Sequence, residues 1–380
     1  MRIGIDGRYI QDHFPGIGRY THRLVAGLAG VVETDTVVVI RNVRLPNTRY
    51  DVAALARLPH VQIIETDVAP FSLAEQWTLP HLARRAGLDV WHAPYYIGPY
   101  CLPCPLVVTL YDAISSRYPQ YLPSVAARLS YEGTMRLALR AARRVISLSE
   151  ASQADLVRFF GAPPTKIAVV YAAADGRYAP QPADVVAELR SRLGLPLRYV
   201  LYLGMNKPHK NLVRLVEAWA LLTGDGATGA ATDATLQLVL AGREDARHQQ
   251  ARQAAERLGA GVRFLGDVAE ADMPALYSGA ALFVFPSLYE GFGLPVLEAM
   301  ACGAPVACST TPSLLEIAGD AAVTFDPLDI EGMAQAMGSI LNQPELRERL
   351  RRRSLEQAAQ FTWRRAAIET LAVYRRALAR

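Results

Sequence analysis

The sequence predicts an α/β protein made of two doubly wound, Rossmann-like domains in tandem. A chain of 380 residues is too long for one ordinary hydrophobic core and suits two. A hydrophobic content of 51% supplies large cores and excludes a disordered chain. Short apolar runs alternate with amphipathic stretches over the whole length, a pattern typical of parallel sheets covered by helices on both faces.

The apolar runs come in two series, and each series predicts the strands of one domain. Residues 1–190 form the expected amino-terminal domain, with strands at 3–6, 36–40, 61–64, 90–92, 106–110, 145–148 and 167–170. The pattern restarts after a polar, proline-containing stretch at 180–196, so we place the domain boundary near residue 190. Residues 191–362 form the expected second domain, with strands at 199–203, 236–241, 262–265, 282–285, 305–307 and 322–325.

Two segments stand apart from this alternation. Apolar residues recur close to every 3.6 positions over 363–378, which predicts one helix. We expect the segment 363–380 to pack back on the first domain. Residues 224–235 are rich in Gly, Ala and Thr, which predicts a surface loop.

Composition narrows the classes of function. A formal net charge of only +4 disfavours a dedicated nucleic-acid-binding protein, which would carry a stronger basic excess. Residues 1–6 resemble a short strand and not a signal peptide, and no run approaches the roughly 18 apolar residues needed to span a bilayer. We therefore expect a cytoplasmic protein that contacts a membrane only at its surface.

The four cysteines do not form a disulfide framework in a chain of this length. Cys101 and Cys104 make a single CxxC, but no second pair lies at a zinc-ribbon spacing. Ordinary thiols are favoured here over metal or redox chemistry.

In open α/β sheets, ligands bind beyond the carboxyl ends of the strands. Two facing domains would therefore place a site in a cleft between them. Only three of the 40 Lys and Arg residues are lysines, and two of them, Lys207 and Lys210, lie in the segment 204–211 that follows the first strand of the second domain. Phosphate groups bind at such positions in Rossmann-like domains, but two solvated lysines beside a turn would give the same pattern.

A second candidate loop, 287–295, follows the strongly apolar strand 282–285. Gly291 and Gly293 permit a close backbone approach, and Pro295 suits the start of a helix. Glu290 lies on the loop and Glu298 in the expected first turn of that helix. Each carboxylate alone is commonplace, but a glycine loop bracketed by two carboxylates suits the recognition of sugar hydroxyls.

The spacing of Glu290 and Glu298, with Gly-Phe-Gly-Leu-Pro between them, resembles the motif of family 4 retaining glycosyltransferases of the GT-B fold. The similarity extends over nearly the whole chain, through the segments 15–20, 89–94, 107–113, 146–150 and 262–266. The nearest members in pattern are the mannosyltransferase-like enzymes of bacterial polysaccharide synthesis. The resemblance implies two domains with an inter-domain cleft, and transfer of a hexose, with mannose from GDP-mannose expected, to a glycan or lipid-linked acceptor.

The resemblance also implies residue roles. Lys210 would neutralise the departing diphosphate, Glu298 would hold the ribose hydroxyls, and Glu290 would hold the transferred sugar. The implied donor-binding set is Gly16, Gly18, Arg19, Lys207, Lys210, Phe264, Glu290, Gly291, Phe292, Gly293, Leu294 and Glu298, and the implied catalytic set is Asp112, Lys210 and Glu290. No Asp-x-Asp occurs in the sequence, so we expect metal-independent transfer with the nucleotide sugar as co-substrate and no other cofactor.

The sequence departs from the family pattern at two positions. Met205 stands where many relatives carry a basic residue, and we infer that Lys207 replaces that charge. Tyr111 stands before Asp112 where many relatives carry histidine. Tyrosine keeps a hydroxyl but is a poor base, with a reference pKa of about 10, and a subgroup that tolerates tyrosine is favoured over altered activity.

Two further features have competing interpretations. His92 follows a strand and is a candidate to line the cleft with Tyr111, although a structural histidine is the favoured interpretation. An arginine-rich stretch is equally compatible with contact to an anionic membrane or lipid-linked diphosphate acceptor and with a solvated helix face. Its members are Arg128, Arg136, Arg140, Arg143 and Arg144.

Two other functions compete with a glycosyltransferase. A catalytically silent homologue would bind nucleotide sugar or glycan within an assembly, and Tyr111 motivates it. A dinucleotide-dependent oxidoreductase needs GxGxxG after a strand. Gly16-Ile17-Gly18 continues as Arg19-Tyr20-Thr21, which disfavours the oxidoreductase.

Overall fold

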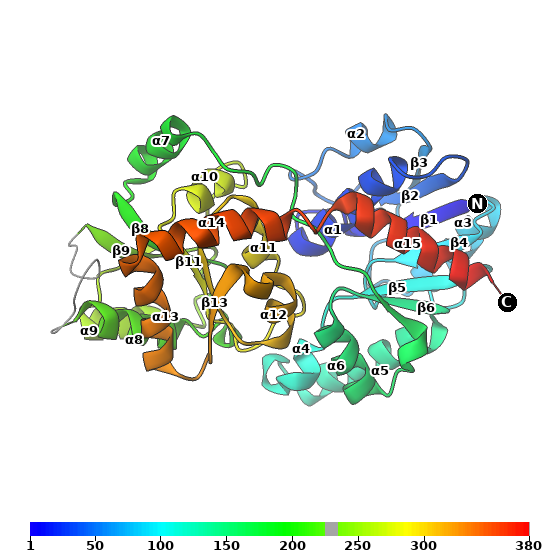
Figure 1. The fold of residues 1–380 in the computed structure, drawn as a ribbon. Coiled ribbons are helices and arrows are strands. Elements are labelled where there is room, and N and C mark those ends of the chain that lie inside the picture. Colours follow the sequence, from blue (N-terminus) through cyan, green and yellow to red (C-terminus); the bar gives the residue numbers. More distant parts are fainter. Residues whose placement is uncertain (225–234, 380) are drawn as a thin grey trace. The chain divides into compact units, whose positions relative to one another are not determined.

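The computed structural model describes residues 1–224 and 235–379, and it divides the chain into two compact units (Figure 1). The first unit holds Met1–Ala173 with Phe361–Arg380, and the second holds Ala174–Gln360. The predicted loop at 224–235 lies outside the described residues except for its two end positions.

A seven-stranded parallel sheet forms the centre of the first unit, in the order β3-β2-β1-β4-β5-β6-β7. Its strands are β1 (Arg2–Asp6), β2 (Thr36–Asn42), β3 (Val61–Thr66), β4 (Val90–Ala93), β5 (Leu106–Leu110), β6 (Arg144–Ser147) and β7 (Ile167–Val169). These are the predicted strands. The five inner strands are short apolar runs buried on both faces, whereas the edge strands β3 and β7 are largely half-buried or exposed.

The helices of the first unit are α1 (Pro15–Ala29), α2 (Val52–Ala56), α3 (Glu75–Arg85), α4 (Ile114–Arg117), α5 (Val125–Ala141), α6 (Glu150–Phe160) and α15 (Trp363–Leu378). Ser124 and Ser149 accept hydrogen bonds from backbone amides in the first turns of α5 and α6, which fixes where these helices begin. A core of Leu79, Trp91 and Met135 joins the helices to the sheet.

A buried ionic cluster lies at the carboxyl end of β1. The Arg8 guanidinium contacts Asp6 at 2.7 Å and Glu75 at 2.9 Å, and all three side chains are buried. Arg8 also donates to the carbonyl oxygen of Ala69 at 3.3 Å. Because each carboxylate has the guanidinium as its partner, the cluster ties the first helical turn of α3 to β1.

The carboxyl-terminal helix α15 packs on the first unit, against α1, β4, β5 and β6 (Figure 1). It contacts α1 closely at Gly27, where an added Cβ would lie 2.8 Å from the Trp363 carbonyl oxygen. The hydroxyl of Tyr374 is 2.6 Å from Nδ1 of His92, and Nε2 of His92 is 2.7 Å from the Thr109 hydroxyl. His92 is fully buried, so this chain of hydrogen bonds fixes α15 to the central strands.

The second unit contains a six-stranded parallel sheet in the order β10-β9-β8-β11-β12-β13. Its strands are β8 (Arg198–Leu203), β9 (Leu236–Ala241), β10 (Val262–Gly266), β11 (Leu282–Phe285), β12 (Val306–Ser309) and β13 (Ala322–Phe325). The helices are α7 (Ala183–Leu193), α8 (Leu212–Thr223), α9 (Gln250–Leu258), α10 (Met273–Ser278), α11 (Leu294–Ala301), α12 (Pro312–Ala318), α13 (Ile330–Asn342) and α14 (Pro344–Ala358). Two doubly wound units are thus confirmed.

The predicted boundary near residue 190 was wrong, because the units divide between Ala173 and Ala174. Helix α7 packs on α10 of the second unit, and Arg192 at its end pairs with Asp272 at 2.6 Å. The stretch 180–196 that suggested the boundary contains α7 of the second unit, and its prolines lie before and after this helix.

Burial of His92 predicts acid sensitivity of the first unit. Burial lowers the pKa of His92 to about 3, whereas the unfolded chain takes up this proton near pH 6.5. The folded state then binds fewer protons below pH 6.5, so stability is complete above that pH and falls as the pH drops from 6.5 toward 3. We expect wild type to lose about 2 kcal/mol from this group between pH 7 and pH 5, and His92→Gln to lack this loss.

Urea unfolding followed by tryptophan fluorescence at both pH values measures the difference. The control is His81→Gln, which removes an exposed histidine from α3. Equal acid sensitivity in wild type and His92→Gln would contradict the role assigned to His92.

Candidate active site

The strand order of the second sheet reverses between β8 and β11, which are hydrogen-bonded neighbours. Loops that follow two such strands diverge to opposite faces of the sheet and leave a crevice at the carboxyl ends. Both candidate loops of this unit begin at that point. Residues 204–211 follow β8, and residues 286–293 follow β11.

An ion pair joins the two loops. Nζ of Lys210 lies 2.6 Å from Oε1 of Glu290, and the two side chains are only 15% and 13% exposed. The ammonium group also lies 5.0 Å from the centre of the Phe285 ring, within range of a cation–π contact. The structure thus brings together two of the three predicted catalytic residues.

Backbone contacts hold the loops in register. The Leu288 amide donates to the His209 carbonyl oxygen at 2.8 Å. Nδ2 of the buried Asn211 donates to the carbonyl oxygens of Pro286, at 3.1 Å, and Pro327, at 2.6 Å. Asn211 adopts a left-handed backbone with φ of 63°, a conformation that asparagine tolerates better than most residues. One side chain therefore connects the loops after β8, β11 and β13.

The glycine loop ends in a conformation that requires glycine. Gly293 has φ of 117°, and an added Cβ would lie 2.5 Å from Cδ2 of Leu314. Helix α11 begins at the next residue, Leu294, with Pro295 in its first turn. Pro295 has no amide hydrogen, and the Val296 and Leu297 amides donate to the Gly293 carbonyl oxygen at 3.0 Å and 3.2 Å. The positive end of the helix dipole still favours a ligand with negative oxygens at this place.

Glu298 lies deeper in the helix than expected. It is the fifth residue of α11, so the expectation that it stands in the first turn was wrong, and a simple interaction with the helix dipole does not explain it. Its side chain is 3% exposed, and Oε2 is 3.3 Å from the Tyr277 hydroxyl. Burial, with the nearby Glu298 charge, raises the Tyr277 pKa well above its usual value, so this hydroxyl stays a donor.

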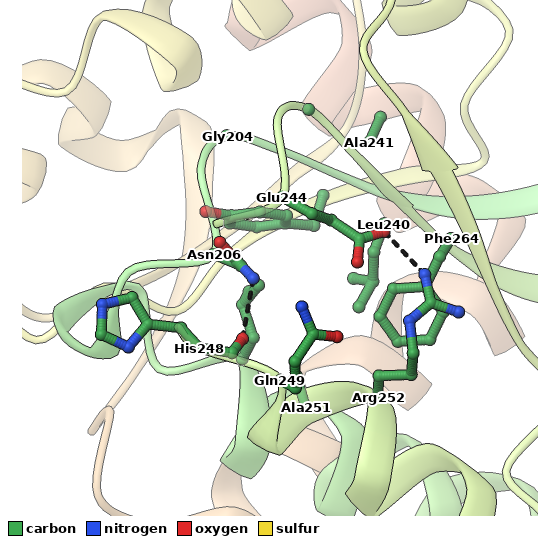
Figure 2. A pocket seen from close by; sticks show the side chains of 13 residues that line it. Gly204, Asn206, Leu240, Ala241, Glu244, His248, Gln249, Ala251, Arg252 and Phe264 are labelled. Carbon is green, nitrogen blue, oxygen red and sulfur yellow. Dashed lines mark hydrogen bonds and ion pairs between the residues drawn. The ribbon is translucent and has the colours of Figure 1, made fainter. Parts of the chain in front are cut away.

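A pocket opens beside the lysine loop, between the ends of β8, β9 and β10 and the start of α9. Figure 2 shows Asn206 and Arg252 on opposite sides of it, with Phe264 behind Arg252. The Arg252 guanidinium lies 4.1 Å from the centre of the Phe264 ring and pairs with Glu244 at 2.7 Å. Phe264, predicted as a donor-binding residue, therefore lines a pocket together with a cation.

The sequence did not predict the roles of Asn206, Glu244 and Arg252. Oδ1 of Asn206 accepts from the Asp245 amide at 2.6 Å, and its Nδ2 donates to the His248 carbonyl oxygen at 2.7 Å, so it holds the loop after β9. No motif marks these three residues. The only available signal was their position just after strands or at a helix start.

Met205 and Lys207, the other two residues that the sequence singled out in the loop 204–211, are exposed to solvent. The exposed fraction of Met205 is 41%. Lys207 has no ion pair in the part of the chain that the structure describes. The pKa of His209 is lowered to about 3, first by burial, then by the charge of Lys210 and then by the charge of Lys207.

In the first unit, the two glycines of the implied donor-binding set, Gly16 and Gly18, are part of a helix. Gly16 and Gly18 lie in the first turns of α1, whereas β1 is followed by a short 3₁₀ turn at Gly7–Tyr9. An added Cβ at Gly18 would lie 2.9 Å from the Tyr50 ring, so this glycine serves internal packing. Gly16 has open space where a Cβ would be, and Arg19 follows it on the helix. Of these two glycines of the implied donor-binding set, only Gly16 has open space beside its backbone.

Asp112 and Tyr111 follow β5, at the carboxyl edge of the first sheet. Oδ1 of Asp112 accepts a hydrogen bond from the Ile114 amide at 2.9 Å, and Ile114 is the first residue of the short helix α4. The Tyr111 ring packs edge-on against Tyr20, and its hydroxyl is buried with no hydrogen-bond partner among the described residues. Burial raises the Tyr111 pKa well above its usual value, so this residue cannot act as a base.

His92 does not line an open site, and its interpretation as a cleft residue was wrong. Both ring nitrogens are used inside the first unit, with Tyr374 and Thr109. Complete burial explains this difference, because a histidine that faces strands and a helix has no surface for a ligand.

Other site classes find little support. In the described parts of the chain, no cluster of three His, Cys, Asp or Glu side chains has the arrangement of a metal site. The four cysteines are free thiols, and burial raises the Cys104 pKa to about 11. None of the described helices is long and apolar enough to cross a bilayer.

Comparison with known proteins identifies the family. The model of "Glycosyltransferase Family 4" matches residues 15–175, and that of "Glycosyl transferases group 1" matches residues 188–357. The O-antigen chain mannosyltransferase B of Escherichia coli is 31% identical over 388 residues, which covers 99% of this chain and 100% of the relative. The chain belongs to the family 4 glycosyltransferases.

Solved structures place this glycosyltransferase in the GT-B fold. Sucrose-phosphate synthase from Thermosynechococcus elongatus matches with a TM-score of 0.73 at 21% identity, covering 99% of this chain and 98% of that one. Anabaena HepE in complex with UDP-glucose gives 0.73 at 20% identity, with 98% and 99% covered. A further relative, the MMP alpha-(1->4)-mannosyltransferase of Mycolicibacterium hassiacum, is 28% identical over 85% of this chain and 82% of its own length.

The contacts of Asn211 predict that substitution of this residue lowers the stability of the glycosyltransferase. Asn211→Gly keeps the left-handed backbone but removes the donor to two buried carbonyl groups, so we expect the second unit to lose about 1–3 kcal/mol of stability. Asn211→Ala should lose more, because the backbone is then strained as well. Denaturant unfolding of the three proteins measures both steps, and an Asn211→Gly variant as stable as wild type would refute the assigned contacts.

Proposed function

We propose that this family 4 glycosyltransferase transfers mannose from GDP-mannose, with retention of the anomeric configuration, to a growing glycan or a lipid-linked acceptor in polysaccharide synthesis. The full-length relative acts, by its name, as an O-antigen chain mannosyltransferase. The Mycolicibacterium relative is also named a mannosyltransferase. These names support mannose over other hexoses.

The observation that carries this proposal is the Lys210–Glu290 pair at the switch point of the second sheet. A cation and a carboxylate at 2.6 Å match the two needs of a nucleotide-sugar donor at its reacting bond. The diphosphate requires positive charge, and the sugar hydroxyls require hydrogen-bond acceptors. In the structure, the Lys210 ammonium and the Glu290 carboxylate are each other's charged partner.

The chemistry follows from the charge that develops during transfer. The bond between the anomeric carbon and the diphosphate oxygen breaks, and its electron pair leaves with the nucleotide diphosphate. The acceptor oxygen forms the new bond to the same carbon and gives its proton to an oxygen of the departing diphosphate. Negative charge grows on the diphosphate in the transition state, so the Lys210 ammonium and the amides at the start of α11 stabilise that state more than the ground state.

The rest of the donor has a place in the same unit. Glu298 is proposed to accept from the ribose hydroxyls, and Glu290 with the amides of Phe292, Gly293 and Leu294 to hold the sugar. The pocket lined by Phe264 and Arg252 is proposed to hold the base, because an aromatic face and a guanidinium both stack on a planar ring. Lys207 adds a solvated positive charge near the diphosphate. This fixed set of charges is proposed to make transfer metal-independent.

Gly16, Gly18, Arg19 and Asp112 belong to the first unit, and their roles toward the donor stay predictions. Of these, Gly18 has the strongest structural explanation of its own, because Tyr50 and the Tyr9 backbone occupy the space beside it.

A catalytically silent homologue is the second candidate, and Tyr111 is the residue that favours it. The two candidates differ in one measurement, which is release or transfer of mannose from GDP-mannose by the purified protein. Product formation excludes the silent homologue, and the anomeric configuration of the product by proton NMR tests retention.

The proposal predicts distinct effects of three substitutions. Lys210→Met should lower kcat about 10²–10³-fold, because it removes a charge aimed at the leaving group. Glu290→Gln should also lower kcat, because it weakens contacts to the reacting sugar. Glu298→Ala should mainly raise the donor KM and reduce the thermal shift produced by GDP, by loss of ribose contacts.

Arg349→Met is the matched control, because Arg349 is exposed on α14 of the same unit. Steady-state rates and a thermal-shift panel of nucleotide diphosphates and their sugars report on turnover and base preference separately. Wild-type rates in both Lys210→Met and Glu298→Ala would rule out the proposed site.

A further inference from the structure

The first unit has an open hollow of about 860 Å³ at the edge of the sheet where β5 and β6 begin. Leu106 and Arg144, the first residues of these strands, line it. The carboxyl ends of α5 and α15 and the segments before β5 and β7 contribute the other lining residues. Asp112 and Tyr111 follow the opposite, carboxyl end of β5, so the hollow is separate from any ligand site at the carboxyl edge of this sheet.

The charged side chains that line the hollow are all positive, and they are Arg140, Arg143, Arg144, Lys166 and Arg376. In the parts of the chain that the structure describes, none of them forms an ion pair with a carboxylate. Arg128 and Arg136, earlier on α5, both pair with Glu132. The arginine-rich stretch of the sequence is thus divided into two arginines that share one carboxylate partner and three that have none among the described residues.

Backbone carbonyl oxygens offset only a fraction of this positive charge. Nζ of Lys166 donates to the Leu139 carbonyl oxygen at 2.6 Å, and Nη2 of Arg143 donates to that of Ala379 at 3.4 Å. These carbonyls belong to the carboxyl ends of α5 and α15, each equivalent to about half a negative charge. Two helix ends therefore offset about one of the positive charges, and a surplus of several remains.

Two further observations show that the positive charges are not compensated. The pKa of Lys166 is lowered, first by burial and then by the charges of Arg143 and Arg144. Nε of Arg144 is buried and has no hydrogen-bond partner among the described residues, although Nη1 of the same side chain donates to the Thr165 carbonyl oxygen at 3.0 Å. A solvated helix face would produce neither effect, because water screens exposed charges and occupies exposed donors.

The cations come from three segments far apart in the sequence. Arg140, Arg143 and Arg144 span the connection from α5 to β6, Lys166 precedes β7, and Arg376 lies in the last turn of α15. Their convergence depends on the return of α15 to the first unit. Beside them the wall is apolar, at Leu102, Leu106 and Leu378.

We propose that this hollow is a second ligand site, which binds a compound that carries two or more phosphate groups. Guanidinium groups form paired hydrogen bonds with phosphate oxygens, and several of them converge here around one concave space. The apolar wall beside the cations would accommodate a non-polar portion of the same ligand. The ligand is either a soluble polyphosphorylated compound or the headgroup of an anionic lipid, which share this chemistry.

Isothermal titration with sodium tripolyphosphate tests the site directly. It is performed in the Lys210→Met background, because the proposed donor site also attracts diphosphates. Arg143→Glu and Arg376→Glu reverse the charge of two exposed side chains in the hollow, and each should weaken binding about tenfold or more. Arg128→Glu, on α5 and outside the hollow, is the matched charge-reversal control, and it should change the dissociation constant less than about twofold.

Flotation with vesicles of cardiolipin, whose headgroup carries two phosphates, or of phosphatidylcholine distinguishes the two sources. Binding of tripolyphosphate that depends on Arg143 and Arg376 supports a soluble ligand. Binding only to cardiolipin vesicles, with the same dependence, supports a lipid headgroup. No binding to either probe, or equal binding in the hollow variants and Arg128→Glu, would overturn the proposal. Retained mannose transfer in Arg143→Glu would show that the outcome is independent of the proposed catalytic function.

Discussion

The ion pair between Lys210 and Glu290 is the interaction on which the proposed donor site of this glycosyltransferase depends. It exists because β8 and β11 are neighbours whose following loops diverge at a reversal of strand order. The hydrogen bonds of Asn211 and the positive φ of Gly293 fix the backbone on both sides of the pair. The pair holds two opposite charges in place with little solvent around them, as the proposed exchange of partners with a donor requires.

The sequence predicted the strands well because each is a short apolar run between polar turns, and burial on both sheet faces leaves few other options for such runs. The convergence of Lys210 and Glu290 was also predictable, since both loops follow strands that a doubly wound order makes adjacent. The boundary near residue 190 failed because a proline-containing stretch indicates irregular chain but not which core the next helix joins. Leu189 on α7 is buried, and its helix packs on the second unit.

Contacts between distant segments explain the other differences. His92 has the sequence position of a ligand-binding residue, but a helix almost at the other end of the chain covers it. Asn206, Glu244 and Arg252 line one pocket because the loop after β9 folds back toward the loop after β8. The arginines with no carboxylate partner could not be distinguished in the sequence from the two that have one, because the difference is a single glutamate, Glu132, one helical turn from each of its partners.

The return of α15 has a consequence for how the protein is made. The first unit takes its final helix from the last residues of the chain, and the whole second unit is synthesised in between. On the ribosome, the amino-terminal sheet must therefore wait with the surface of α1, β4, β5 and β6 that α15 will cover still exposed. The second unit, which is continuous in sequence, can close first. The unit whose synthesis begins first is thus the unit whose core can be completed only last.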